Sequence, residues 1–215
     1  MKKILVRFVK LNFGLFLYAL GIVVTIKANI GYGPWEVFHV GLGKTVGITI
    51  GTASILVGLA IIVFTLLLGE KIGIGTILNM VMIGIFTDIL LNLDIIAVVD
   101  NTYLGILVLV IGLYIISVGS FFYIGSGFGA GPRDSLMVAL TRKTKLPVGV
   151  IRSLNELTVT LMGWIFGGMV GIGTVISVIA IGMCVQTTFY LFRFDVTAVK
   201  QATVMDSYRE IRGFF

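Results

Sequence analysis

The stretch GSGFGAGPRDSLMVALTRK, residues 125–143, breaks an otherwise apolar sequence with glycines, a Gly-Pro pair and a basic end. An earlier stretch, ANIGYGPWEVFHVGLGK at residues 28–44, has the same order of residue types. In each stretch a Gly-x-Gly-Pro element is followed by a carboxylate two positions after the proline and by a cation ten positions after it. A pattern that occurs twice in this detail indicates an internal repeat.

Aligning the chain with itself at an offset of 98 residues extends the repeat well beyond these two stretches. No gap is needed from residue 15 to residue 93, and 19 of the 79 aligned positions are identical. This composition alone would give about six or seven identities, so the match indicates a duplicated unit. The sequence therefore predicts two structurally equivalent halves.

The composition places the chain in a membrane. Of its 215 residues, 58% are hydrophobic and only 12% are charged, and the mean hydropathy is +1.11. Apolar runs approach the length of about 20 residues that crosses a hydrocarbon core as helix. We expect an all-α membrane protein with six transmembrane helices, at residues 11–28, 50–68, 75–93, 103–124, 149–167 and 172–192.

The distribution of lysine and arginine predicts the orientation. With both termini in the cytoplasm, 14 of the 16 basic residues lie on the cytoplasmic side, and only Lys27 and Lys44 lie outside. The expected location is the bacterial cytoplasmic (inner) membrane, and the lipid bilayer is the first expected partner. Trp35, Tyr103 and Trp164 fall near the outer interface, where aromatic rings anchor helices.

Each half contains three spans, so the second half must enter the membrane from the opposite side. The predicted fold is two inverted-topology repeats of three helices, an arrangement typical of transporters. The predicted regions are a cytoplasmic basic N-terminus at 1–10, repeat 1 at 11–95, an external linker at 96–102, repeat 2 at 103–195 and a cytoplasmic tail at 196–215. Within the tail, residues 198–212 could form a short helix on the inner leaflet.

Each Gly-x-Gly-Pro element is expected to begin a short helix. Glycine releases the chain from helical geometry, and proline suits the first helical turn. About eleven residues give a helix of about 16 Å, half a bilayer. Two placements stay open: the short helices could lie flat at the interface, or they could be re-entrant with their N-termini converging on a site for an anionic or zwitterionic ligand. The candidate substrate-binding residues are Gly31, Gly33, Pro34, Glu36, Gly129, Gly131, Pro132 and Asp134.

Two carboxylates inside spans, Asp88 and Glu156, are candidates for ion or proton coupling, because a charge in the membrane is costly. Alternative interpretations are structural: Glu156 could pair with Arg152 one helical turn away, and Asp88 could reach the outer headgroups. His39 could be a lone interfacial histidine. The carboxylates Glu36 and Asp134 could simply complement the helix dipoles.

Several function classes are excluded by what the sequence lacks. A single histidine and a single cysteine, Cys184, exclude a metal cluster built from these residues, and we expect no metal and no cofactor. No nucleophile–base constellation or nucleotide-binding motif is present, so we expect no catalytic residues and no enzyme activity. Membrane topology explains the net charge of +6 without a nucleic-acid partner.

The basic N-terminus, GYGPWEVFHVGL, the Gly-Ile-Gly-Thr turn and GFGAGPRDSLMVAL together resemble the YczE-like branch of the bacterial YitT/YczE family of multi-spanning membrane proteins. The resemblance covers about residues 10–200 and implies no particular activity. The repeat and the broken elements favour a transporter or permease for a small polar metabolite, anionic or zwitterionic. The alternative is a non-transporting accessory protein whose basic loop and tail bind a cytoplasmic partner or anionic lipid. A homo-oligomer is also an open alternative.

Overall fold

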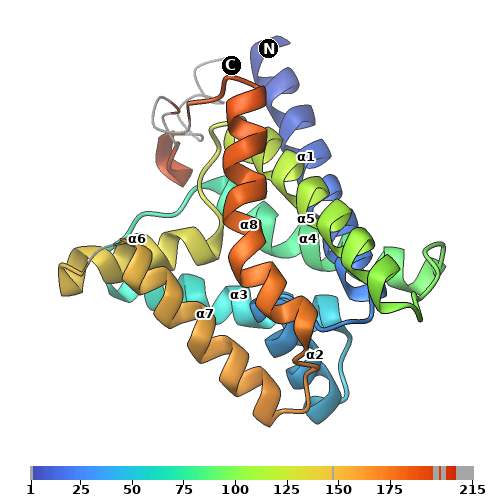
Figure 1. Ribbon diagram of the computed structural model, residues 1–215. Helices are drawn as coiled ribbons and strands as arrows, with labels where there is room; N and C mark the ends of the chain where they lie inside the picture. The colour runs from blue at the N-terminus through green and yellow to red at the C-terminus, as the bar shows by residue number, and fades with distance from the viewer. Residues whose placement is uncertain (1, 147, 196–198, 200–201, 207–215) are drawn as a thin grey trace.

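The computed structural model describes residues 2–146, 148–195, 199 and 202–206, which are helical with no strand. The helices, shown in Figure 1, are α1 (Lys2–Lys27), α2 (Pro34–Val46), α3 (Ile50–Leu67), α4 (Ile74–Leu93), α5 (Thr102–Ile124), α6 (Pro132–Thr144), α7 (Val148–Ile165) and α8 (Ile172–Leu191). We call α1–α4 the first half and α5–α8 the second half. The all-α prediction is confirmed for these residues.

Five helices of the described chain are long and apolar enough to cross a membrane: α1 from Ile4 onward, α3, α4, α5 and α8. The sixth expected span corresponds to α7, which has 18 residues but contains Arg152, Asn155 and Glu156 and does not reach the same hydropathy. The basic segment predicted at 1–10 is continuous with the first span from Lys2 onward, because α1 begins there.

The most extensive helix–helix contact joins α1 and α5, which lie side by side and run antiparallel (Figure 1). Glycines bring the two backbones together: a Cβ on Gly14 would lie 2.8 Å from the Gly119 carbonyl oxygen, and one on Gly21 would lie 2.7 Å from that of Gly112. Small residues allow this close approach, which is a common way for membrane helices to gain packing energy without a hydrophobic driving force.

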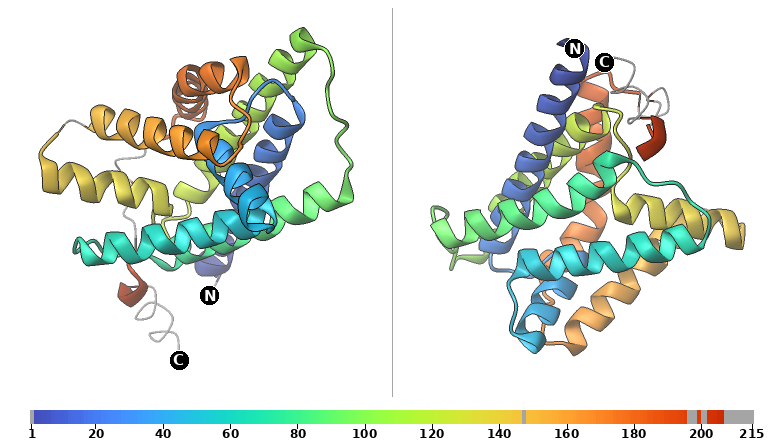
Figure 2. Two further views of the ribbon diagram at one scale, coloured as in Figure 1. Left: turned by 90° about the horizontal axis from the view of Figure 1, so that it is seen from below. Right: turned by 180° about the vertical axis from the view of Figure 1, so that it is seen from behind.

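The short helices pack across the two halves, whereas α4 and α8 pack within their own half (Figure 2). The short helix α2 of the first half lies against α7, and the short helix α6 of the second half lies against α3. Within the halves, α4 packs on α1 and α8 packs on α5. In the α2–α7 contact, a Cβ on Gly163 would lie 2.4 Å from the backbone nitrogen of Phe38, so a larger residue would push the helices apart.

The loops that precede the short helices are held by the other half. The Gly173 N–H donates to the Ile30 carbonyl at 2.7 Å, and the Gly75 N–H donates to the Phe128 carbonyl at 2.8 Å. Gly31 and Gly129 in these loops have φ of +115° and +126°, a region that favours glycine. These contacts fix where α2 and α6 begin.

The start of α1 and the end of α8 lie at the same end of the bundle, at the top of Figure 1. There the Arg7 side chain donates to the Ser126 carbonyl at 2.8 Å. Of the predicted tail, residues 199 and 202–206 are described, and the Ala202 and Val204 N–H groups donate to the Gly127 and Ile72 carbonyls. Most of the expected helix at 198–212 lies outside the described residues.

Candidate functional site

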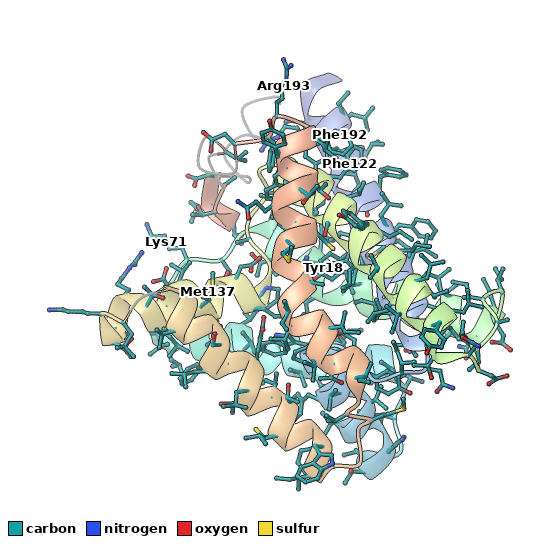
Figure 3. All side chains as sticks on the ribbon, viewed as in Figure 1. Tyr18, Lys71, Phe122, Met137, Phe192 and Arg193 are labelled. Atoms are coloured by element: carbon teal, nitrogen blue, oxygen red, sulfur yellow. The ribbon has the colours of Figure 1, made fainter. Side chains whose placement is uncertain are left out.

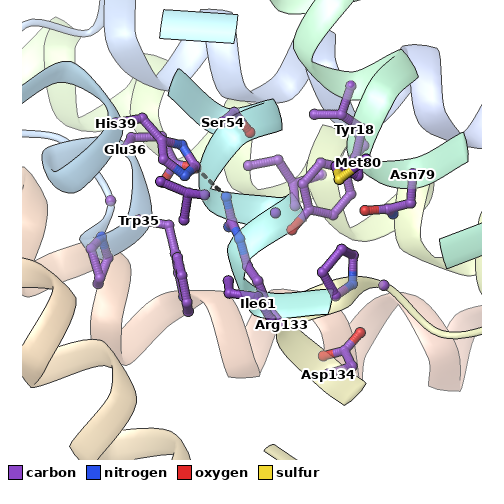
Figure 4. A pocket seen from close by; sticks show the side chains of 18 of the residues that line it. Tyr18, Trp35, Glu36, His39, Ser54, Ile61, Asn79, Met80, Arg133 and Asp134 are labelled. Carbon is purple, nitrogen blue, oxygen red and sulfur yellow. Dashed lines mark ion pairs between the residues drawn. The ribbon is translucent and has the colours of Figure 1, made fainter. Parts of the chain in front are cut away.

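A cavity of about 160 Å³ lies between the two halves, where α2 and α6 begin (Figure 4). Both halves contribute to its wall, including Tyr18 of α1 and Met137 of α6, which are labelled in Figure 3. Aliphatic side chains such as Ile61, Ile83 and Ile116 form its apolar part. An apolar enclosure with a few polar groups is the usual form of a small-molecule site.

The two short helices begin at this cavity in the same way. Pro34 and Pro132 occupy the first helical positions, and their N-cap residues, Gly33 and Gly131, have extended backbone with φ of −61° and −62°. Neither N-cap side chain accepts a bond from the helix, because glycine has none. The first backbone N–H groups of a helix carry partial positive charge, so two uncapped positive ends adjoin one cavity.

Across the cavity, Arg133 of α6 reaches toward α2 (Figure 4). Its guanidinium lies 3.7 Å from a Glu36 carboxylate oxygen and 4.6 Å from the centre of the Trp35 ring. The Arg133 side chain is 27% exposed and that of Glu36 is 11% exposed, so the pair is largely shielded from solvent. The two half-helices are therefore linked by an ion pair and a cation–π contact.

Beside the first turn of α6, the Tyr123 hydroxyl donates to the Asp134 carboxylate at 2.9 Å. The Tyr123 ring also meets the Tyr18 ring edge-on, with centroids 6.1 Å apart. The Asn79 side chain lies 3.3 Å from where a Cβ on Gly131 would be. Tyrosine, amide and carboxylate groups thus surround this part of the cavity.

Ser177 of α8 also lines the cavity. Only 2% of this residue is exposed, and its hydroxyl has no hydrogen-bond partner among the described residues. Leaving a buried hydroxyl unpaired is unfavourable by about 1–3 kcal/mol. A buried hydroxyl without a protein partner at a cavity wall is free to bond a molecule inside the cavity.

The structure brings most of the predicted site residues together, since Gly33, Pro34, Glu36, Gly131, Pro132, Asp134 and Glu156 all line the cavity. Gly31 and Gly129 do not line it and instead form the loops described above. Asp88 lies elsewhere: its carboxylate accepts from the Gly51 N–H at 2.8 Å and from the Thr49 hydroxyl at 2.5 Å. Asp88 therefore caps the start of α3.

Sequence reasoning missed several cavity residues. Arg133 was counted only as a cytoplasmic charge, and Trp35 was expected at the outer interface, yet both line the cavity. His39, expected at the interface, is 3% exposed and also lies on the wall. Their position in the sequence could have indicated this. Trp35 and Arg133 directly follow the two prolines and so share a helical turn with the predicted carboxylates.

In the described part of the chain, no group of three or more His, Cys, Asp or Glu side chains is arranged to hold a metal ion. The long apolar helices, together with the large apolar side chains exposed on the bundle, define a multi-pass α-helical membrane protein. More specifically, the chain belongs to the family of unknown function DUF6198, which matches residues 5–189.

The relatives that match the chain in sequence carry names that mark them as uncharacterised. The membrane protein YczE of Bacillus subtilis is 39% identical over 176 residues, which cover 80% of each chain. An uncharacterised Haemophilus influenzae protein is 32% identical over 82% of this chain and 80% of its own, and Bacillus subtilis YyaS is 27% identical over 82% and 89%. No solved structure matches the chain significantly. The YczE-like resemblance predicted from sequence is thereby confirmed.

Proposed function

We propose that the protein is a transporter or permease for a small polar metabolite, anionic or zwitterionic, and not an enzyme. The observation that carries the proposal is the cavity at the junction of the two halves, onto which the positive ends of α2 and α6 open. Discontinuous helices that end at a shared site between repeats are the usual way transporters bind a charged substrate.

In the proposed architecture, α1, α3, α4, α5, α7 and α8 form six spans, and the two halves are inverted repeats with both termini in the cytoplasm of a bacterial inner membrane. Matched contacts support this. The α2–α7 packing has its counterpart in α6–α3, and α1–α4 has its counterpart in α5–α8. The hydrogen bond from Gly173 to Ile30 has its counterpart, 98 residues away at both ends, in the bond from Gly75 to Phe128.

One helix–helix contact differs between the two halves, and a transport cycle would account for the difference. In the first half α3 packs closely on α4, and Gly84 lies against Gly51 and Ile55. Among the described residues of the second half, α7 makes no comparably extensive contact with α8, and Gly182, the counterpart of Gly84, has open space around it. Exchanging these two conformations between the halves would open the cavity to the opposite side of the membrane.

Glu156 is the better placed candidate for ion or proton coupling, because it lines the cavity. Asp88 is assigned a structural role in this proposal, because both of its oxygens are used at the start of α3. A basic accessory protein would need neither a cavity with polar groups between the two halves nor a hydroxyl left unpaired on its wall.

Reconstitution into vesicles tests the proposal. Uptake of labelled amino acids and small carboxylates is measured for the wild type and for two variants of α4. Ile83→Trp fills the cavity, since Ile83 is 6% exposed on its wall, whereas Ile85→Trp adds the same bulk to a side chain that is 39% exposed. Uptake by the wild type and the Ile85 variant, but not by the Ile83 variant, is expected. An absence of uptake of every solute by well-inserted wild-type protein would refute transport and favour the accessory role.

A further inference from the structure

We propose that the cavity binds a zwitterion with one amine and one carboxylate, of the size of a small α-amino acid, and that Arg133 receives its carboxylate while Glu36 receives its amine. This assignment deepens the proposed function and rests on it for the transport step. The binding assignment itself can be tested without transport.

The first argument is that the hydrogen-bonding capacity of Arg133 is unused. A guanidinium has five N–H donors, arranged to bind a carboxylate through two parallel hydrogen bonds. Arg133 makes no hydrogen bond within the described residues, and its 3.7 Å separation from Glu36 is longer than a hydrogen bond. The pair is electrostatic only, so a ligand carboxylate at bonding distance would replace Glu36 as the better partner.

The second argument is that the wall offers partners for both charges: the carboxylates of Asp134 and Glu156 favour a positive group, and other groups favour a negative one. The uncapped N-termini of α2 and α6 present partial positive charge there. The Ser177 hydroxyl is buried and unpaired on the wall, and it can donate to an anionic oxygen.

The third argument decides between an anion and a zwitterion. An anion that took Arg133 would leave the Glu36 carboxylate, 11% exposed, without its cation. An uncompensated buried charge is strongly destabilising. A ligand that also carries an ammonium group restores the balance, because the ammonium can replace the guanidinium beside Glu36 and over the Trp35 ring.

The cavity volume sets the size of the ligand. The cavity has a volume of about 160 Å³. A cavity of about 150 Å³ accepts benzene, with six non-hydrogen atoms. The ligand in this conformation is therefore of the size of glycine, alanine or serine.

Calorimetric titration of the purified protein in lipid nanodiscs tests the assignment. The probes are L-alanine, propionate, which lacks the amine, and ethylamine, which lacks the carboxylate. We expect L-alanine to bind at least about tenfold more tightly than either. Arg133→Gln should weaken L-alanine binding at least about tenfold, and Arg133→Lys should weaken it less, because lysine keeps the charge but not the planar fork.

Three variants separate this role from a structural one. Glu36→Gln should weaken L-alanine binding yet improve propionate binding. Propionate bound to Arg133 would then no longer leave the buried carboxylate of residue 36 without a cation. Ser177→Ala should weaken L-alanine binding while leaving the thermal stability of the empty protein equal or higher, since the substitution removes an unpaired hydroxyl. Arg142→Gln is the matched control on α6, because Arg142 is 69% exposed and pairs with Glu70 instead.

Equal binding of ethylamine and L-alanine would overturn the assignment, as would unchanged L-alanine binding in Arg133→Gln. So would a lack of binding of any carboxylate probe. Vesicle uptake keeps the two proposals distinguishable. Uptake that persists in Arg133→Gln, without competition by L-alanine, refutes the ligand assignment and leaves transport standing. Binding of L-alanine through Arg133 without any uptake refutes transport and leaves the binding site standing.

Discussion

The difference between the α3–α4 and α7–α8 contacts predicts opposite effects for one substitution at two equivalent positions. Gly84 in α4 and Gly182 in α8 lie 98 residues apart, inside helices of 20 residues each. We predict that Gly84→Ala lowers the free energy of unfolding and that Gly182→Ala raises it. The two variants carry the same substitution at equivalent positions of helices of equal length, so each is the control for the other.

The expected magnitude follows from the space around each glycine. A Cβ on Gly84 would lie 2.5 Å from Ile55 Cγ1 and 2.7 Å from the Gly51 oxygen, whereas ordinary contacts begin at 3.4 Å, and nothing lies within 4 Å of a Cβ on Gly182. Alanine is favoured over glycine in a helix by about 1 kcal/mol at both sites. Overpacking opposes this only at Gly84, by about 1–3 kcal/mol. The variants should therefore differ by about 1–3 kcal/mol.

The assay is thermal unfolding of each purified variant in detergent, followed by far-ultraviolet circular dichroism. For a chain of this size, 1 kcal/mol shifts the Tm by about 2–4 °C, so the Tm of Gly182→Ala should exceed that of Gly84→Ala by about 2–12 °C. Equal Tm values, or a lower Tm for Gly182→Ala, would show that α8 packs as tightly as α4. The proposed exchange of conformations would then lose its main support.

Three further predictions concern transport, stability and topology. Gly182→Leu should insert and keep its Tm but lose vesicle uptake, because α7 could no longer close on α8; uptake at the wild-type rate would contradict the exchange. Asp88→Asn should lower the free energy of unfolding by about 1–2 kcal/mol through the weakened cap of α3, measured by thermal unfolding, and an unchanged Tm would exclude that role. In a Cys184→Ala background, an impermeant thiol reagent added outside intact cells should label cysteine at Val46 but not at Thr144, and the reverse pattern would refute the proposed orientation.

The local sequence predicts the short helices well. Glycines followed by a proline indicate the start of a helix, and the observed helices begin at Pro34 and Pro132 as expected. What local sequence left open was whether these helices lie flat or point inward. That choice depends on contacts far along the chain, such as the bond from Gly173 to Ile30, and the structure places both N-termini at the same internal cavity.

The charged residues show why the site was only partly predictable. Counting lysine and arginine by loop gives topology, but it treats Arg133 like every other cation and does not indicate that its side chain reaches Glu36. The contacts of Asp88 were equally hidden from local sequence. A carboxylate within a span suggests function, yet its partners Gly51 and Thr49 lie 37 and 39 residues earlier, where helical periodicity cannot reveal them.

The two halves contribute equivalent backbone but different chemistry to the cavity, and this difference bears on what the cavity can bind. Each short helix begins with Gly-Pro and carries a carboxylate at its third position, but the residue between them is Trp35 in α2 and Arg133 in α6. Two identical half-sites would suit a symmetric ligand. Here α2 contributes an aromatic ring and a carboxylate, and α6 contributes a guanidinium and a carboxylate. These unlike half-sites suit a ligand with unlike ends, held in one orientation.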